Sequence, residues 1–256
     1  MKNTIAAGAR TGTEASESAA AANVQAMFDD IAPTYDRLNH LLSFGLDRRW
    51  WRKTALAFRD VLARPDARVL DLCCGTGDQT AALAQERRQL LANSEDDAPI
   101  TGLDFSSQML ERARQKYPSP QIEWREGDAM QLPFADNSFD LVTSAFGFRN
   151  LSNYAAGLSE IHRVLRPGGR IGILEANQPE DASALLYNAY FQHVLPWVGG
   201  VLSGKRAAYA YLPASVARFP RPPQMMERMC DAGFAGVVWD RYLLGSAGLY
   251  RGIKPG

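Results

Sequence analysis

The stretch from Val69 to Asp78 constrains the fold of this chain more than any other. It reads Val-Leu-Asp-Leu-Cys-Cys-Gly-Thr-Gly-Asp, and a helical pattern follows from Gln79 to Arg88. An apolar strand, a glycine turn and a helix in this order form the first unit of a nucleotide-binding α/β sheet. Glycine carries no Cβ atom, so the backbone of such a turn can approach a ligand closely. The stretch therefore predicts a nucleotide or nucleoside site at the end of the first strand.

The composition of the turn favours S-adenosylmethionine over a dinucleotide. Gly75 and Gly77 are present, but Thr80 stands where a dinucleotide-binding turn has its third glycine. Asp71, just before the turn, suits a ligand with a cationic amino-acid part, and S-adenosylmethionine is such a ligand. A Gly-x-Gly turn alone does not exclude other nucleotides. We predict that Asp71, Gly75, Thr76 and Gly77 contribute to the cofactor site.

Strand and helix patterns alternate along the rest of the chain. Predicted strands cover residues 68–72, 100–103, 122–124, 139–143 and 171–174, and predicted helices between them cover residues 79–88, 106–116 and 154–165. This alternation predicts a doubly wound α/β fold, in which right-handed crossovers join parallel strands and helices cover both faces. Residues 236–243 and 248–253 predict an antiparallel hairpin that completes the sheet.

Acidic residues follow the second and third predicted strands, at the edge where such sheets bind ligands. Asp104 ends the second strand, 27 residues after Gly77, and can accept hydrogen bonds from both ribose hydroxyls of an adenosine. Its alternative role is that of an acid at a helix N-terminus. Asp128 is either an acceptor for an adenine amino group or a turn acid. We predict Asp104, Asp128 and Ala129 as cofactor-binding residues.

Composition excludes several classes of protein. The 28 Lys and Arg residues balance the 28 Asp and Glu residues, so net charge does not indicate a nucleic-acid partner. Cys73, Cys74 and Cys230 lack metal-ligand spacing, and no metal site is predicted. No apolar run is long enough to span a membrane, and no basic segment followed by an apolar one opens the chain. We therefore expect a cytoplasmic protein.

Domain boundaries follow from the position of the first strand. Residues 1–22, rich in Ala, Gly, Ser and Thr, predict a disordered tail, and residues 23–256 predict one domain. Residues 23–65 show helical spacing and are predicted to form a lid over the ligand edge. The run from Arg48 to Lys53 either packs its tryptophans on the domain or contacts a membrane surface. We expect any such contact to be peripheral, at the inner face of the cell membrane.

Longer motifs give the chain a family resemblance. Gly127-Asp128-Ala129, Asp136-Asn137-Ser138-Phe139-Asp140 and residues 163–170 are similar to class I S-adenosylmethionine-dependent methyltransferases, which have a Rossmann-like fold. More specific motifs resemble the ubiquinone/menaquinone C-methyltransferase family; they lie at residues 31–39, 42–46, 146–150, 193–196, 209–220 and 250–255. The resemblance covers residues 24–255 and implies S-adenosylmethionine as the methyl donor.

The resemblance implies methylation of a ring carbon of a polyprenylated quinol. For this family that is demethylmenaquinol to menaquinol in menaquinone biosynthesis, or the 2-methoxy-6-polyprenyl-1,4-benzoquinol step of ubiquinone biosynthesis. Cys73-Cys74 and residues 102–106 look more like the menaquinone-type members. Alternatives are another apolar acceptor, such as a sterol or phospholipid, a cofactor-binding regulator without turnover, and a nucleotide-dependent oxidoreductase. Ala145 stands where some members have a cofactor-side serine, so that contact is not carried over.

Arg149, Asn150 and Tyr35 match the family's catalytic positions, as the resemblance implies. A quinol ring carbon becomes nucleophilic when a hydroxyl ionises, and a nearby cation lowers the pKa of that hydroxyl. In this family the arginine is also thought to work with a water, held by the Tyr and Asn, that removes the ring proton. Arginine is a poor base, so we predict an orienting and electrostatic role for Arg149. A structural salt bridge is the alternative.

Residues 176–220 predict a helical insertion after the fifth predicted strand. Their apolar residues are too many for one side of a surface helix. With the predicted lid they could wall an apolar pocket for an isoprenoid tail. Extra core or a homodimer interface are equally compatible with the pattern.

Overall fold

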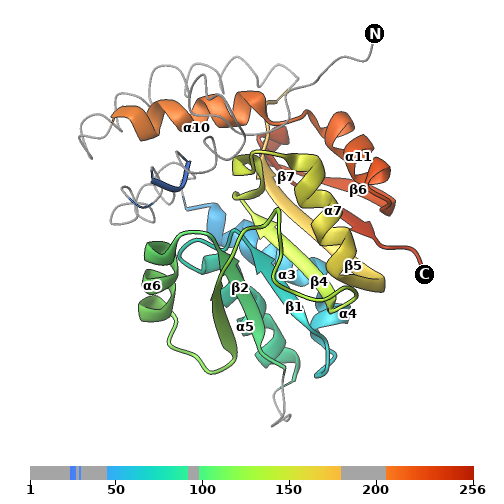
Figure 1. The fold of residues 1–256 in the computed structure, drawn as a ribbon. Coiled ribbons are helices and arrows are strands. Elements are labelled where there is room, and N and C mark those ends of the chain that lie inside the picture. The colour runs from blue at the N-terminus through green and yellow to red at the C-terminus, as the bar shows by residue number, and fades with distance from the viewer. Residues whose placement is uncertain (1–23, 27–28, 30–44, 92–97, 180–205) are drawn as a thin grey trace.

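The strand that ends at Leu72, just before the glycine turn, is an inner strand of a mixed sheet (Figure 1). The computed structural model describes residues 24–26, 29, 45–91, 98–179 and 206–256. The strands are β1 (Val69–Leu72), β2 (Ile100–Asp104), β3 (Ile122–Glu126), β4 (Phe139–Ala145), β5 (Leu165–Ala176), β6 (Ala235–Tyr242) and β7 (Ala247–Ile253). They form a 7-stranded sheet in the order β3-β2-β1-β4-β5-β7-β6.

The direction of winding reverses between β1 and β4. Strands β1 to β5 pair in parallel, and β7 is antiparallel to both β5 and β6. The doubly wound, mostly parallel sheet and its closing antiparallel hairpin are thereby confirmed. In such sheets the ligand crevice lies outside the carboxyl ends of the strands at the reversal. A ligand site is therefore expected at the carboxyl ends of β1 and β4.

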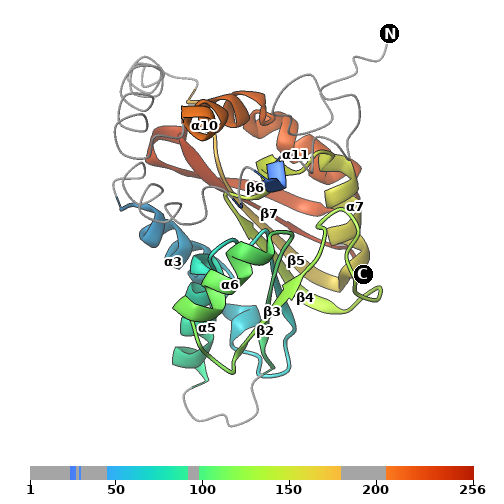
Figure 2. The ribbon, with the colours of Figure 1, turned by 60° about the vertical axis from the view of Figure 1, so that its left-hand side comes forward.

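Helices cover both faces of the sheet (Figure 2). On one face lie α3 (Asp47–Ala57), α4 (Arg59–Leu62) and α5 (Asp78–Leu90), and on the other lie α7 (Tyr154–Val164) and α11 (Pro222–Asp231). Helix α6 (Ser107–Lys116) packs against β2 and β3, and α10 (Arg206–Arg218) crosses the upper end of the sheet in Figures 1 and 2. Short 3-10 helices, η1 (Phe148–Asn150) and η3 (Leu243–Gly245), follow β4 and β6.

Alternating side chains of the buried strands build a core on each face. Leu70 and Leu72 belong to the cluster beneath α7 and α11, whereas Val69 belongs to the cluster beneath α3, α4 and α5. Every residue of β1 and β2 is buried, as is typical of central parallel strands. Phe58 packs so closely on β5 that a Cβ atom at Gly172 would lie 2.5 Å from its ring. The core thus ties α3 and α4 to the sheet.

Capping residues set several helix ends. Ser106, the N-cap of α6, accepts a hydrogen bond from the backbone N–H of Met109 at 3.2 Å. Asn153 caps α7 in the same way. Helix α11 begins with Pro222 at its first position and stops before Gly233, whose φ of +95° is left-handed.

The start of β5 differs from the sequence-based expectation. Residues 166–169 predict a turn between a helix and a strand at residues 171–174. Helix α7 ends at Val164, but β5 already begins at Leu165, and its register against β4 shifts between Phe139 and Leu141. The backbone of this stretch exchanges hydrogen bonds with Lys254. The turn is therefore an irregularity inside the strand, held by the C-terminal residues.

Several predictions fall on residues that the structure does not describe. These are the tail over residues 1–22, the lid residues 23, 27–28 and 30–44, and residues 180–205 of the insertion. The proposed domain boundaries stay predictions. The described end of the insertion contains α10, which is helical as expected. Within the described part of the chain, no helix combines the length and the apolar character needed to cross a membrane.

Candidate functional site

A cavity lies at the carboxyl ends of β1, β2, β3 and β4, at the predicted ligand edge. Its described walls come from the turns after these strands, from α6 and from the N-terminal segment. The lining residues are Val24, Cys73, Gly75, Leu103, Asp104, Phe105, Met109, Gly127, Asp128, Ala129, Met130, Gly147, Asn150, Leu151 and Ser152. This cavity therefore brings together predicted site residues from the ends of four strands: Gly75, Asp104, Asp128, Ala129 and Asn150.

The two glycines of the turn have different tasks. Gly75 lines the cavity, and its φ of +54° is left-handed. Gly77 does not line it, although its φ of +88° also requires glycine. A Cβ atom at Gly77 would lie 2.3 Å from the ring of Trp124 on β3. Only the first glycine therefore offers its backbone to a ligand, and the second accommodates a neighbouring side chain. Thr76, between them, is buried and donates to Asp78 at 3.2 Å.

Asp104 presents a buried carboxylate to the cavity. Its Oδ2 accepts the backbone N–H of Gly75 at 2.8 Å, and its Oδ1 accepts that of Ser106 at 2.9 Å. The two oxygens together have about four lone-pair sites, and the backbone N–H groups of Gly75, Phe105 and Ser106 use part of them, so acceptor capacity remains for hydroxyl groups of a ligand. Burial raises the pKa of Asp104 to about 6, and the backbone hydrogen bonds act against this rise. The geometry fits a ligand with a vicinal diol.

Asp71 lies behind the cavity wall. It is fully buried, and its two oxygens accept hydrogen bonds from the hydroxyls of Thr80 at 2.6 Å and Thr143 at 2.7 Å. Burial raises its pKa to about 7. These bonds tie β1 to α5 and β4, directly beneath the glycine turn. Its predicted contact with a cationic ligand group stays a prediction, because Asp71 is not among the described lining residues.

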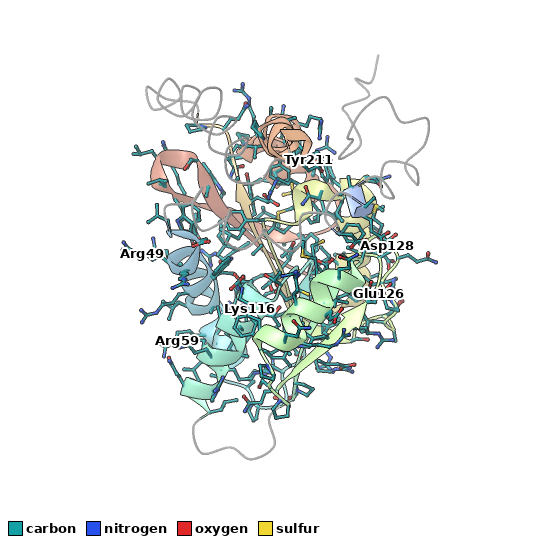
Figure 3. The ribbon with its side chains drawn as sticks, turned by 90° about the vertical axis from the view of Figure 1, so that its left-hand side faces the viewer. Arg49, Arg59, Lys116, Glu126, Asp128 and Tyr211 are labelled. Carbon is teal, nitrogen blue, oxygen red and sulfur yellow. The ribbon has the colours of Figure 1, made fainter. Side chains whose placement is uncertain are left out.

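The loop after β3 contributes the far wall of the cavity. Asp128 accepts the backbone N–H of Met130 at 2.8 Å through Oδ1, and its side chain is exposed (Figure 3). Ala129 is buried beside it. Asp128 therefore stabilises the turn and also places its carboxylate at the ligand edge, so its position is compatible with both of its predicted roles.

The described N-terminal residues lie against the same edge. Val24 is buried and lines the cavity, and Gln25 donates to the carbonyl oxygen of Phe105 at 2.8 Å. Ser106 donates to the carboxylate of Asp29. These contacts support the predicted position of the N-terminal segment over the site. Tyr35, predicted as catalytic, lies outside the described residues.

Arg149 forms a buried ion pair with Glu175 at the end of β5. Its Nη1 lies 2.9 Å from Oε2 of Glu175, and its backbone N–H donates to Oε1 at 3.0 Å. The same Nη1 donates to the carbonyl of Phe146, and Nε donates to Ser215 on α10 at 3.3 Å. The carboxylate of Glu175 thus balances the charge of Arg149. The salt-bridge alternative is present in the structure, and the predicted electrostatic role of Arg149 stays a prediction.

Asn150 lines the cavity, and α10 orients it. Tyr211, labelled on α10 in Figure 3, donates its hydroxyl to Oδ1 of Asn150 at 3.1 Å. Because Oδ1 is occupied, the amide can offer its NH2 group as a donor. Burial raises the pKa of Tyr211, so the hydroxyl keeps its proton and remains a donor. Helix α10, at the described end of the predicted insertion, therefore contributes to the site by orienting Asn150.

The cysteines of the turn are structural. Cys73 has a left-handed φ of +53°, and Phe146, at the end of β4, has a φ of +57°. Such conformations are costly for residues other than glycine and gather at functional sites. A Cβ atom at Gly147 would lie 2.3 Å from that of Cys73, so the two turns touch. Burial raises the pKa of both Cys73 and Cys74 well above the ordinary value, which keeps them as thiols.

Sequence reasoning missed the residues that support Arg149 and Asn150. Glu175 carried a signal, since it is an acid directly after a predicted buried strand. Tyr211 and Ser215 carried none except their place in a family-like motif, because their partners are more than 60 residues away in the chain. Met109 and Met130 line the cavity but look like ordinary core residues in the sequence.

Solved structures share the fold. A SAM-dependent methyltransferase from Thermotoga maritima matches with a TM-score of 0.59 and 20% identity, over 90% of this chain and 99% of that one. A methyltransferase from Haloferax volcanii, solved with the Trm112 activator, also has a TM-score of 0.59, with 22% identity over 90% of this chain and 98% of that one. At this identity the likeness establishes the fold alone.

Sequence relatives are much closer. A demethylmenaquinone methyltransferase of Deinococcus radiodurans is 45% identical over 90% of this chain and 92% of its own length. One of Thermus thermophilus is 45% identical over 90% of this chain and all of its own length. A ubiquinone/menaquinone biosynthesis C-methyltransferase of Geotalea daltonii is 42% identical over 90% and 96%.

A family model described as ubiE/COQ5 methyltransferase matches residues 15–254. This match confirms the predicted family, the methyltransferase activity and S-adenosylmethionine as the methyl donor. Fold, site and relatives agree, and the chain belongs to the ubiE/COQ5 methyltransferase family.

Proposed function

We propose that this protein transfers a methyl group from S-adenosylmethionine to a ring carbon of demethylmenaquinol and so forms menaquinol. The names of the relatives support this substrate, since those at 45% identity are demethylmenaquinone methyltransferases. The observation that carries the proposal is the cavity in which the diol-binding Asp104 and the donor Asn150 lie on the two sides of the sheet's reversal point.

The described lining fits S-adenosylmethionine. Asp104 accepts the ribose hydroxyls, Gly75 brings its backbone close, and Leu103 and Met109 offer apolar surface to a base. Asp128 accepts from an exocyclic amino group. When bound, S-adenosylmethionine supplies a methyl group on a positively charged sulfur, and much of the rate of such a transfer comes from alignment of the two reacting atoms.

Residues of the chain bind the quinol and favour the ionisation of its hydroxyl group. Asn150 donates its amide N–H to a quinol oxygen, which stabilises that oxygen as it ionises. Arg149 and Glu175 hold the short helix η1 in place, so Asn150 keeps its direction. Tyr35 takes part in holding the water that removes the ring proton. In this proposal Arg149 acts mainly through position, because Glu175 balances its charge.

The ubiquinone route is the second candidate. The relative from Geotalea daltonii carries both pathways in its name. The benzoquinol and the naphthoquinol share the ionisable hydroxyl and the apolar tail, so the described contacts serve either ring. A direct comparison of turnover on the two substrates decides between them.

One experiment tests cofactor site and catalytic site separately. We expect Asp104→Asn to weaken S-adenosylmethionine binding by about tenfold or more, because charge-assisted hydrogen bonds contribute ~1.5–3 kcal/mol. We expect Asn150→Ala to lower kcat on short-chain demethylmenaquinol by about a hundredfold with cofactor affinity unchanged. Calorimetric titration and a methyl-transfer assay with both quinol types measure these quantities.

Glu126→Gln serves as the matched control, since this exposed carboxylate at the end of β3 is not among the described lining residues (Figure 3). Unchanged cofactor affinity in Asp104→Asn would contradict the cofactor site. Turnover on neither quinol, with cofactor binding intact, would contradict the proposed substrate class. Preferred turnover of the benzoquinol would assign the protein to the ubiquinone step.

Access to a lipid substrate calls for contact with a membrane, and we propose that the ligand edge supplies it. Leu243 and Leu244, at the tip of the β6–β7 hairpin, are 53% and 65% exposed. Strand β6 runs parallel to β5, so this tip lies at the ligand edge. Lys53 of α3 lies 4.7 Å from the ring of Tyr242, next to the tip. Apolar side chains beside cations suit an anionic lipid surface.

A further inference from the structure

A second cavity lies between the end of β5, the end of α10 and the start of α11. Its volume is ≈ 200 Å³, and Asn177, Gln178, Arg218, Phe219, Arg221 and Gln224 are among its lining residues. None of these residues lines the cofactor cavity. Most of the named side chains are polar, and two of them are guanidinium groups. Such a lining is unlike the apolar wall expected around an isoprenoid tail.

Arg218 is the informative residue of this cavity. Its Nε and Nη2 atoms are buried and have no hydrogen-bond partner within the described part of the chain. These two nitrogens form one edge of the guanidinium, the edge that binds an oxyanion through two parallel hydrogen bonds. The centre of the guanidinium lies 5.6 Å from the ring of Tyr211, which offers a weak cation–π contact. Buried donors without acceptors cost free energy, and an oxyanion bound at this edge would supply the missing acceptors.

Other described groups near the cavity add to its positive charge. Glu175 is already engaged by Arg149 through two hydrogen bonds, one of which is also the ion pair. The two arginines, Arg149 and Arg218, both act to lower the pKa of Tyr211 against the rise caused by burial, so both lie near its hydroxyl. Arg221 adds a further guanidinium at the cavity. Guanidinium groups at a cavity favour an anion as its ligand.

The remaining groups are suited to a tetrahedral oxyanion. The side chain of Asn177 accepts a hydrogen bond from Tyr250 and donates one to the carbonyl oxygen of Glu175. Asn177 therefore serves as a wall of the cavity rather than as a ligand. Gln224 accepts the backbone N–H of Arg221 at 3.2 Å through Oε1, which leaves its NH2 group as the donor. Donors thus surround the cavity on more than one side, and a phosphate group has acceptors in all directions.

We propose that this cavity is a binding site for a phosphate group, with Arg218 as its bidentate ligand. Two sources offer this chemistry: inorganic phosphate and the headgroup of an anionic phospholipid. The site lies beside the proposed membrane contact, because the backbone N–H of Asn177 donates to Ser246, next to the hairpin tip, at 2.9 Å.

The test uses the full chain in phosphate-free buffer. Inorganic phosphate is titrated into the wild type, Arg218→Gln, Arg218→Lys and the control Arg228→Gln, which lies on α11 but not at the cavity. Sodium chloride at matched ionic strength corrects for screening. We expect Arg218→Gln to lose affinity for phosphate by about tenfold or more, Arg218→Lys to fall between, and Arg228→Gln to match the wild type.

Thermal melting gives a second readout that does not depend on activity. Phosphate should raise the Tm of the wild type and of Arg228→Gln by mass action, but not that of Arg218→Gln. The Tm of each variant without phosphate serves as its own reference, so the shift caused by phosphate is compared rather than the Tm itself. Equal phosphate affinity in the wild type and Arg218→Gln, including no binding by either, would overturn the proposal.

A vesicle arm distinguishes the two sources. Flotation with phosphatidylglycerol vesicles, compared with phosphatidylcholine alone, is measured for the wild type and Arg218→Gln. Loss of flotation in the variant, and competition by inorganic phosphate in the wild type, would identify a lipid headgroup. Unchanged flotation together with lost phosphate binding would identify soluble phosphate as the ligand. Both results support the site, and neither depends on the identity of the quinol.

Discussion

Two aspartates at the ends of neighbouring strands show how position decides the role of a residue. Asp71 and Asp104 are both buried, and burial raises the pKa of each. Asp71 is closed off by two threonine hydroxyls, whereas Asp104 keeps acceptor capacity that faces the cavity. The same side chain is therefore a structural acceptor on one strand and a ligand acceptor on the next.

These shifts predict how stability depends on pH. The unfolded chain releases the two protons near pH 4, and the folded protein keeps them to about pH 6 to 7. The folded state binds more protons in this window, so the free energy of unfolding of the ligand-free protein falls as pH rises through it. We expect Asp71→Asn to reduce the slope by up to about 1.4 kcal/mol per pH unit.

Urea unfolding at several pH values between about 4.5 and 7.5 measures this slope. The exposed Asp136 provides the control, as Asp136→Asn should keep the slope of the wild type. The lowered pKa of His162 acts in the opposite direction below pH 6.5, but equally in all variants, so the comparison of slopes removes it. Identical slopes in the wild type and Asp71→Asn would refute the prediction.

At the scale of elements, the unit β1–turn–α5 depends on packing from β3. The ring of Trp124 covers Gly77 in the turn and Gly102 on β2. The motif that appears in the sequence as one local signal is thus completed by a side chain 47 residues further on. The same holds for η1, which contains two predicted catalytic residues but is held by Glu175 of β5 and Ser215 of α10.

Two glycines with the same backbone conformation separate strain from packing. Gly77 and Gly168 have φ values of +88° and +78°, but nothing lies within 4 Å of a Cβ atom at Gly168. We expect Gly168→Ala to cost about 1–2 kcal/mol from the left-handed backbone alone. Gly77→Ala should cost about 1–3 kcal/mol more, because Trp124 must shift. Urea unfolding measures the loss of stability in each variant. Equal losses would show that Trp124 can shift without a cost in free energy.

At the scale of the whole molecule, the carboxyl edge of the sheet gathers every feature that bears on function. The cofactor cavity, the Arg218 cavity, the first turns of α3 and the hairpin tip all lie there. Trp50 and Trp51 of α3 are half-buried against the core, while Arg48, Arg49, Arg52 and Lys53 are exposed. The predicted packing of the tryptophans is present, and the exposed cations remain available to a membrane.

The proposed membrane contact predicts an asymmetry between the two ends of the sheet. Leu243→Glu with Leu244→Glu should lower flotation with phosphatidylglycerol vesicles by about tenfold, since burial of one leucine contributes ~1.5 kcal/mol or more. Ile253→Glu is the control, because Ile253 is 41% exposed on β7 at the opposite end. Equal flotation of both variants would exclude the hairpin tip as the contact.

The sequence by itself determined the fold class, the order of the strands in the chain and the residues of the glycine turn. These depend on local periodicity and on backbone geometry, which adjacent residues encode. It also indicated Asp104, because parallel strands have their carboxyl ends at one edge, and Asn150, through the resemblance to a known family. Only the tertiary structure decided that Asp71 is enclosed by threonine hydroxyls, that Gly77 leaves room for the ring of Trp124 and that the charge of Glu175 balances that of Arg149. Hydrogen bonding and burial of these groups depend on partners distant in the chain, which no local pattern records.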